Sequence, residues 1–221
     1  MASLLPDITP PIEDYLKTIY AVVGESVEGR ATTSAIAERM DVSAASATNM
    51  MQRLAEMKLV EYVPYRGVSL TPGGEKIALE VIRHHRLLEL YLAEALGYSW
   101  DEVHAEAERL EHVISEEFED RIDAMLGHPT TDPHGDPIPS KTGSVAPDPR
   151  RPLSEVAAGE SVVVGRVDDR DGDILREIAR LQLVPGARVT VVESLAGGKV
   201  VLRRSERELT VPPEIARRVF V

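Results

Sequence analysis

Prolines divide this chain of 221 residues into two parts of different character. Seven of the 15 prolines fall between Pro129 and Pro152, in the stretch PTTDPHGDPIPSKTGSVAPDPRRP. Because proline fixes its own φ angle and lacks an amide donor, this stretch predicts an extended connector rather than a packed element. Helical patterns precede it and strand patterns follow it, so the sequence predicts a helical N-terminal part and a β-rich C-terminal part.

The first 74 residues predict a winged helix-turn-helix domain. The segment IEDYLKTIYAVV carries its apolar residues on one stripe, as a helix does, and TTSAIAERM predicts a second, shorter helix. After the turn DVS, Ser43 is the predicted cap of a third helix, AASATNMMQRLAEMK. LVEYVPYRGVSLTP contains two strand-like runs around Arg66-Gly67 and therefore predicts a β-hairpin, the wing.

Short polar side chains on the third predicted helix indicate a DNA-reading surface. Asparagine and glutamine can form paired hydrogen bonds with adenine in the major groove, and arginine can reach guanine or phosphate. The alternative is a solvated helix face in another three-helix domain, and the hairpin that follows directly makes it less favoured. The predicted DNA-binding residues are Ser43, Ala45, Ser46, Thr48, Asn49, Gln52, Arg53 and Arg66.

Two long amphipathic segments follow and predict a helical metal-binding and dimerisation domain over residues 75–146. The first is GGEKIALEVIRHHRLLELYLAEALG. The second, SWDEVHAEAERLEHVISEEFEDRIDAML, is predicted to be one helix with Ser99 as its cap. Long helices placed after a winged helix commonly bury their apolar faces against a symmetry mate, which predicts a homodimer.

Negative charge and histidines are concentrated in these helical segments. The formal net charge is −12, and residues 87–128 alone hold 12 acidic and 2 basic residues. The stretch HAEAERLEH places four potential ligands on one helical face: His104, Glu108, Glu111 and His112. The preceding helix adds His85 and Glu89, four residues apart. Since the chain has no cysteine, these side chains predict a metal site of carboxylate oxygens and imidazole nitrogens.

The C-terminal part predicts a small, partly open β-barrel over residues 153–221, after a linker at 147–152. SVVVGRV, ARVTVVES, KVVLRR and ELTVP are the predicted strands, and DILREIARLQL is the helix between them. Near the end of the chain, Val211 and Val219 are predicted core residues.

Four segments in order, IEDYLKTIY, RHHRLLE, HAEAERLEHVIS and HGDPIP, resemble the diphtheria toxin repressor family. This resemblance implies a metal-dependent transcriptional repressor, not an enzyme, that binds a palindromic operator in double-stranded DNA as a homodimer. It also implies an SH3-like third domain, similar to ferrous-transport-accessory proteins, and about two metal ions per chain. The implied activating site is Asp14, Glu108, Glu111 and His112. The implied ancillary site is His85, Glu89 and His104, with Asp171 or Asp173 of the third domain as a further ligand.

Three departures from the family pattern bear on the metal that is bound, on the number of closely spaced ions and on the family's anion pocket. Iron-type members of the family place methionine and cysteine where this chain has Asp14 and Glu108, and the exchange of soft ligands for carboxylates favours Mn²⁺, with Fe²⁺ as the competitor. Lys17 stands where two-domain manganese regulators carry a glutamate, which argues against a closely spaced metal pair at that site. Asp136 replaces an asparagine of the family's anion pocket, to which Arg86 would contribute, so that pocket is in doubt.

Two other functions fit parts of the pattern less well. A di-metal enzyme of the ferritin type needs a Glu-x-x-His motif on each of two helices, and this chain does not repeat one. A regulator of an organic ligand needs a largely apolar pocket, whereas only 4% of the residues are aromatic. The absence of a bilayer-spanning apolar run or a signal peptide predicts a cytoplasmic protein with no membrane partner.

Overall fold

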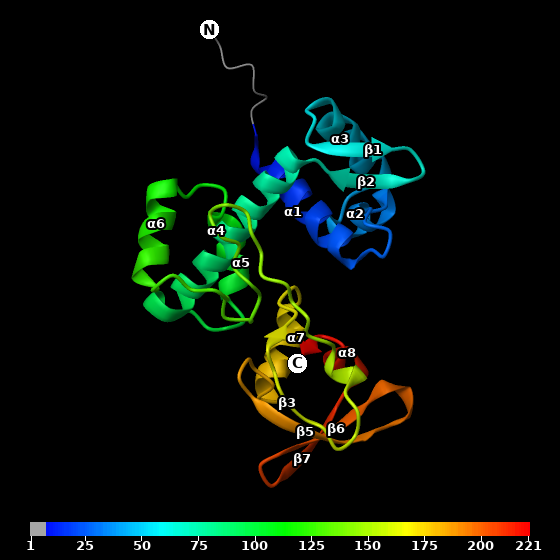
Figure 1. The fold of residues 1–221 in the computed structure, drawn as a ribbon, viewed down its shortest axis with the longest axis vertical. Coiled ribbons are helices and arrows are strands. Elements are labelled where there is room, and N and C mark those ends of the chain that lie inside the picture. Colours follow the sequence, from blue (N-terminus) through cyan, green and yellow to red (C-terminus); the bar gives the residue numbers. More distant parts are fainter. Residues whose placement is uncertain (1–7) are drawn as a thin grey trace. The chain divides into compact units, whose positions relative to one another are not determined.

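The computed structural model describes residues 8–221, which form two compact units. The first unit holds residues 8–84 with 139–144, and the second holds residues 85–138 with 145–221. Helix α4, Pro72–Leu96, is labelled in Figure 1; its residues 72–84 belong to the first unit and its residues 85–96 to the second. No helix within residues 8–221 is long and apolar enough to cross a membrane.

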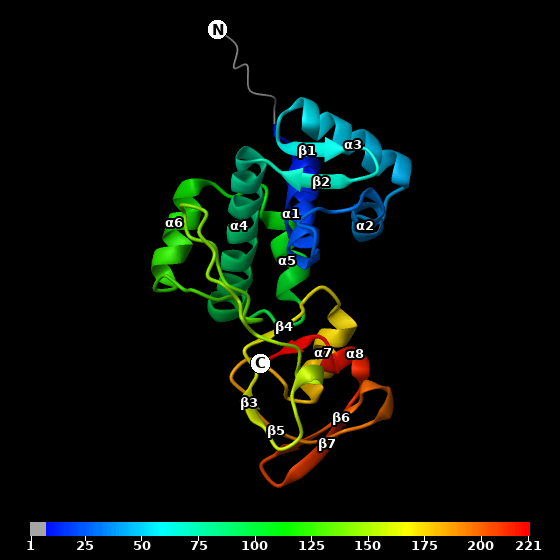
Figure 2. The same cartoon turned by 45° about the vertical axis from the view of Figure 1, so that its right-hand side comes forward.

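The first unit is a winged helix. It contains α1 (Pro10–Glu25), α2 (Thr33–Arg39) and α3 (Ala44–Glu56), followed by an antiparallel hairpin of β1 (Val60–Val63) and β2 (Gly67–Leu70). Both views show the hairpin alongside α3 (Figures 1 and 2). The Ser43 side chain caps α3 by accepting a hydrogen bond from the amide of Ser46. These helices, the cap at Ser43 and the hairpin confirm the sequence prediction.

Apolar side chains from all three helices and the hairpin form one core in this unit. The stripe predicted on α1 is its contribution, because Ile12, Leu16 and Ile19 are each 0% exposed. Burying each such side chain stabilises the fold by about 1.5–3 kcal/mol. The core leaves the opposite, polar face of α3 free to meet solvent or a ligand.

The second unit begins with the remainder of α4, followed by α5 (Val103–Leu110) and α6 (Glu116–Met125). These helices share a core that includes Leu88, Leu92 and Ile122. The prediction of one continuous helix over SWDEVHAEAERLEHVISEEFEDRIDAML is wrong, because residues 111–115 separate α5 from α6. The β-branched pair before Ser115 weakens the helix there, and the Ser115 hydroxyl caps α6 by accepting from the amide of Phe118. Ser99 does not cap α5 either, and its hydroxyl donates instead to the carboxylate of Glu102.

Residues 129–138 also differ from their prediction, because they pack within the second unit instead of forming an unpacked connector. Asp132 and His134 are buried, and Ile138 belongs to the same core as α4, α5 and α6. The local cause is an Asx-type turn: Asp132 Oδ1 accepts hydrogen bonds from the amides of His134 (2.8 Å) and Asp136 (2.9 Å). Here the prolines shape a tight, buried loop.

The C-terminal part of the second unit is an antiparallel β structure with short helices. Its four-stranded sheet has the order β3 (Ser161–Val163), β5 (Arg188–Ser194), β6 (Val200–Arg204), β7 (Arg207–Val211). A second, two-stranded sheet pairs β4 (Arg166–Val167) with β8 (Val219–Phe220). The helices are α7 (Gly172–Arg180), α8 (Pro213–Ala216) and the short 3-10 turns Leu153–Glu155 and Ala196–Gly198. The two sheets do not close into a barrel within the described residues, and Val211 and Val219 are core residues as predicted.

Candidate metal centre

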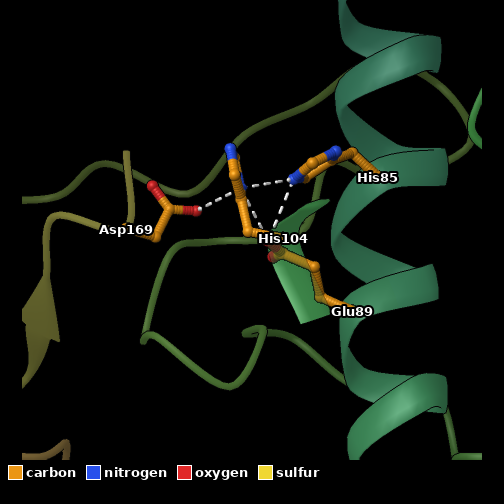
Figure 3. A group of neighbouring side chains, drawn as sticks. All are labelled: His85, Glu89, His104 and Asp169. Carbon is orange, nitrogen blue, oxygen red and sulfur yellow. Dashed lines mark hydrogen bonds and ion pairs between the residues drawn. The ribbon is translucent and has the colours of Figure 1, made fainter. Parts of the chain in front are cut away.

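Four ligand-type side chains meet in the second unit, and we call them the inner cluster (Figure 3). They are His85 and Glu89 on α4, His104 on α5, and Asp169, which follows β4. His85 Nε2 lies 2.9 Å from Glu89 Oε1 and 3.1 Å from His104 Nδ1. His104 Nδ1 in turn lies 3.1 Å from Glu89 Oε1 and 3.4 Å from Asp169 Oδ2.

The spacing of these atoms suits a small divalent cation. Around an ion with metal–ligand distances of about 2.1 Å, neighbouring ligands of an octahedral shell are about 3.0 Å apart. Three nitrogen and oxygen atoms of the inner cluster are separated by 2.9–3.1 Å. The residues present therefore fit a metal held by two imidazoles and two carboxylates, all of them ligands for hard or intermediate cations.

Protons balance the charge of the inner cluster in the metal-free protein. Burial alone would lower the pKa of His104, but hydrogen bonds to Asp169 and Glu89 raise it to about 10. Burial alone would raise the pKa of Glu89, but the charge of His85 and the hydrogen bond with His104 hold it well below its ordinary value. At neutral pH, His104 is therefore an imidazolium that a metal must deprotonate before it can bind.

Glu108, Glu111 and His112 lie next to the inner cluster, and we call them the outer cluster. Glu111 is 1% exposed, and its Oε2 accepts a hydrogen bond of 2.5 Å from Nδ1 of His85. Its other oxygen lies 3.5 Å from His112 Nε2, and Glu108 Oε1 lies 3.9 Å from His85 Nδ1. The four ligand-type residues predicted on one face of HAEAERLEH therefore lie close together, with His104 in the inner cluster and the other three in the outer cluster. His85 contacts both clusters. Asp14 is a half-buried residue of α1 in the first unit.

The third-domain carboxylate of the inner cluster is Asp169, whereas the sequence pointed to Asp171 or Asp173. Asp171 caps α7, because its Oδ1 accepts from the amides of Asp173 (3.0 Å) and Ile174 (3.2 Å). The Asp173 side chain is exposed and pairs with Arg176. An aspartate directly before a helix is more often an N-cap than a metal ligand, and this rule could have excluded Asp171 from the sequence alone.

Arg86 marks a neighbouring polar region. Its guanidinium donates to the carbonyl of Pro137 at 2.5 Å and to Asp136 Oδ1 at 3.2 Å. Arg166 lies 3.6 Å from the same Asp136 oxygen. The two arginines therefore have a carboxylate partner of their own at the place where the family's anion pocket was in doubt.

The predicted DNA-binding residues lie on the exposed side of the first unit. Ala45, Asn49, Gln52 and Arg53 are exposed along α3, and Arg66 is exposed in the hairpin turn. Three hydroxyls have local partners, because Ser43 contacts Ser46 and Thr48 donates to the carbonyl of Ala44. The amide and guanidinium groups are thus the side chains best placed to contact bases.

A winged helix together with a buried cluster of histidines and carboxylates defines a metal-responsive DNA-binding protein. Family models match three consecutive regions: the iron dependent repressor N-terminal DNA binding domain (residues 7–68), the iron dependent repressor metal binding and dimerisation domain (residues 71–140), and the FeoA domain (residues 151–221). The chain belongs to the diphtheria toxin repressor family of metal-dependent transcriptional repressors, as its resemblance predicted.

Two named repressors with similar sequences support this assignment, and one of them matches almost the whole chain. The iron-dependent repressor IdeR of Mycobacterium tuberculosis (strain ATCC 25618 / H37Rv) is 35% identical over 227 residues, covering 97% of this chain and 98% of IdeR. The diphtheria toxin repressor of Corynebacterium diphtheriae is 36% identical over 135 residues, covering 61% of this chain and 59% of the repressor.

Solved structures match as well. The structure of a manganese-dependent transcriptional repressor in complex with manganese has a TM-score of 0.86 and 37% identity, covering 95% of this chain and 98% of that one. The manganese regulator SloR has a TM-score of 0.77 and 32% identity, covering 96% and 98%.

Proposed function

We propose that this protein is a homodimeric repressor that Mn²⁺ activates, with Fe²⁺ as a competing metal, and that it binds a palindromic operator controlling metal homeostasis genes. The observation that supports manganese is the donor set. Both clusters offer only carboxylate oxygens and imidazole nitrogens, and the chain has no cysteine. Such a set suits Mn²⁺ better than it suits metals that prefer thiolates.

The relatives include both manganese-dependent and iron-dependent repressors, which supports Mn²⁺ and Fe²⁺ as the two candidate metals. Structures described as manganese-dependent repressors share 37% and 34% of their residues with this chain, and the iron-dependent IdeR shares 35%. Because affinities of divalent ions for one site overlap, the metal available to the protein contributes to the choice.

Activation would follow from charge neutralisation. We assign Glu108, Glu111 and His112 to the activating metal together with Asp14, and the assignment of Asp14 rests on the family resemblance alone. When bound, the metal supplies positive charge to carboxylates that otherwise repel one another. This chain's own residues would link the DNA-binding domain to the dimerisation domain through that shared ion. Metal affinity and operator affinity are then coupled reciprocally.

Calorimetric titration of the full-length, metal-free protein tests the proposal. Mn²⁺, Fe²⁺ under anaerobic conditions and Zn²⁺ are titrated separately into the wild type and the Asp14→Ala variant. The expected result is that Mn²⁺ binds with defined stoichiometry and that Asp14→Ala loses one site. Absence of Mn²⁺ binding, or binding that Asp14→Ala leaves unchanged, would contradict the proposal.

Mn²⁺ affinity at the inner cluster should increase with pH. The pKa of His104 is about 10 without metal, so the metal displaces its proton throughout the neutral range. The apparent Mn²⁺ affinity of the inner cluster should then rise up to about tenfold per pH unit for each proton displaced, and it should be weaker near pH 6 than near pH 8. Titrations in buffers of different ionisation enthalpy count the released protons. The exposed His128, replaced by Gln, is the matched control, and a pH-independent affinity would refute the expectation.

Replacing Asn49 with Ala should weaken sequence discrimination more than overall DNA binding. Asn49 is exposed on the polar face of α3, and a paired amide–adenine contact contributes about 1–3 kcal/mol of discrimination. Operator sequences would be selected from random DNA with the metal-loaded wild type, then compared with single-base variants by fluorescence anisotropy. Gln182→Ala, an amide removed from the third domain, is the control. Equal discrimination by wild type and Asn49→Ala would exclude a base contact by this residue.

A further inference from the structure

The turn of the wing holds an exposed aromatic side chain in an unfavourable backbone conformation. Tyr65 is fully exposed, and its φ of +64° lies in the left-handed region that favours glycine. The amide of Arg66 donates to the carbonyl of Val63 at 3.0 Å, which makes residues 63–66 a tight turn. After a proline such as Pro64, the left-handed position of such a turn is normally glycine or asparagine. Tyrosine therefore adds backbone strain here without burying its ring.

The strands below this turn are held firmly by a neighbouring segment. The amide and the carbonyl of Ala31 each form a hydrogen bond of 2.8 Å with Val68 of β2, so a third short strand lies beside the hairpin. Nη2 of Arg30 donates to the carbonyl of Glu61 in β1 at 2.9 Å and to that of Gly67 in β2 at 3.4 Å. Because these bonds fix both strands, the surrounding structure maintains the strained turn in one orientation.

The exposed side chains of residues 63–66, which we call the wing tip, are three nonpolar groups and one cation. Val63, Pro64 and Tyr65 are exposed next to Arg66, and the wing tip contains no carboxylate. Binding to phosphates alone is served best by several cations, whereas the wing tip has one. Proteins that enter the minor groove of DNA use nonpolar side chains together with arginine. The composition of the wing tip therefore suits a minor groove.

A solvated turn or a protein partner explains the wing tip less well. The other hairpin of this chain with a left-handed residue in its turn, β6–β7, has the small polar Ser205 there, with φ +56°. Turn chemistry explains that serine, but it does not explain Tyr65. Four residues at a hairpin tip cannot bury the area of about 1,000 Å² that a stable protein interface needs. The hairpin does lie alongside α3, the predicted DNA-reading helix (Figures 1 and 2).

We propose that Tyr65 is a specificity-determining residue whose ring enters the minor groove of the operator beside the segment contacted by α3, where it selects A·T base pairs. This contact rests on the proposed operator binding. The neighbouring minor groove lies half a helical turn, about five base pairs, from the centre of the major-groove contact. A G·C pair carries an amino group in the minor groove, which obstructs the ring, whereas an A·T pair does not. A·T tracts also narrow the groove and attract the guanidinium of Arg66.

Two glycine variants and two changes in the DNA test this contact. Tyr65→Gly removes the ring together with the left-handed strain, and Ser205→Gly makes the same backbone change in the third domain as the matched control. Operators are selected from random DNA with the Mn²⁺-loaded, full-length wild type, and affinities are measured by fluorescence anisotropy. The flanking A·T pairs are then replaced by G·C or by inosine·cytosine. Inosine lacks the amino group, so this pair resembles A·T in the minor groove and G·C in the major groove.

Both variants should be at least as stable to chemical denaturation as the wild type, because relief of strain offsets the freedom that glycine gains in the unfolded chain. Tyr65→Gly should bind the operator about fivefold or more weakly, the usual effect of one lost base-pair contact, and Ser205→Gly should bind as the wild type does. Flanking G·C pairs should weaken binding by the wild type, inosine·cytosine should restore it, and Tyr65→Gly should not distinguish the two.

Three results would overturn the minor-groove contact while leaving operator binding intact. They are unchanged affinity of Tyr65→Gly, equal loss of affinity with G·C and inosine·cytosine, and a loss of stability in Tyr65→Gly that Ser205→Gly does not share. The last result would show that the ring supports the fold. Failure of the metal-loaded wild type to bind any selected DNA would overturn both the contact and the proposed function.

Discussion

Replacing Glu111 with Gln should reduce the operator affinity measured at saturating Mn²⁺ to the affinity of the metal-free protein. The Glu111 side chain is buried between His85 and His112, so no other residue can take its place in the outer cluster without rearrangement. Glutamine has the same shape but lacks the anionic oxygen that a hard cation needs. Coupling between a metal site and a second ligand is commonly 5- to 150-fold, and we expect a loss of about that size.

The control for this prediction is Glu117→Gln, which removes an exposed carboxylate from α6. Circular dichroism checks that both variants keep their helices. Mn²⁺-dependent operator binding by Glu111→Gln that equals the wild type would show that the outer cluster does not activate the protein.

A second large effect is expected from Gly135→Ala, which should destabilise the second unit by about 3 kcal/mol or more. Gly135 has φ +88°, and an added Cβ would lie 2.0 Å from the carbonyl oxygen of Gly165. That contact joins the 129–138 loop to the third domain, where the amide of Val167 donates to the carbonyl of His134 and Arg150 donates to the carbonyl of Gly135. The backbone cannot relieve such an overlap without separating these segments.

Gly186→Ala separates steric overlap from backbone strain. Gly186 has the same φ of +88°, but no atom lies within 4 Å of the position of its added Cβ. It should therefore cost only the strain of a left-handed alanine, about 1–2 kcal/mol. Chemical denaturation of both metal-free variants measures the difference. Equal losses of stability would mean that the contact with Gly165 tolerates a methyl group.

Local patterns in the sequence were sufficient to predict much of the fold and part of the metal centre. The apolar stripe of α1, the cap at Ser43 and the turn at Arg66-Gly67 act over a few residues, and each was found. The pair His85 and Glu89 also follows from helical spacing alone. The family resemblance, not periodicity, related this pair to a second helix.

The parts that were missed depend on contacts between distant segments or on competing local signals. Asp169 joins His104 only because the third domain packs in the same unit, a non-local contact that spacing does not report. His134 and Asp132 were hidden in a proline-rich stretch that resembles a linker. The break before α6 had a local signal, since Ser115 followed by two glutamates is a typical helix start.

The position of His85 between the two clusters has a consequence for how the protein responds to rising metal concentration. Its Nε2 faces the inner cluster, while its Nδ1 donates to Glu111 of the outer cluster. An ion on Nε2 leaves the Nδ1–H in place and holds the Glu111 carboxylate in one rotamer, so the outer cluster is ordered before its own ion arrives. Because the first ion orders the Glu111 side chain, binding of the second ion costs less conformational entropy. The occupancy of the two clusters should then rise sigmoidally with the free metal concentration. The repressor would act as a threshold switch over a narrow range of free metal instead of a graded sensor.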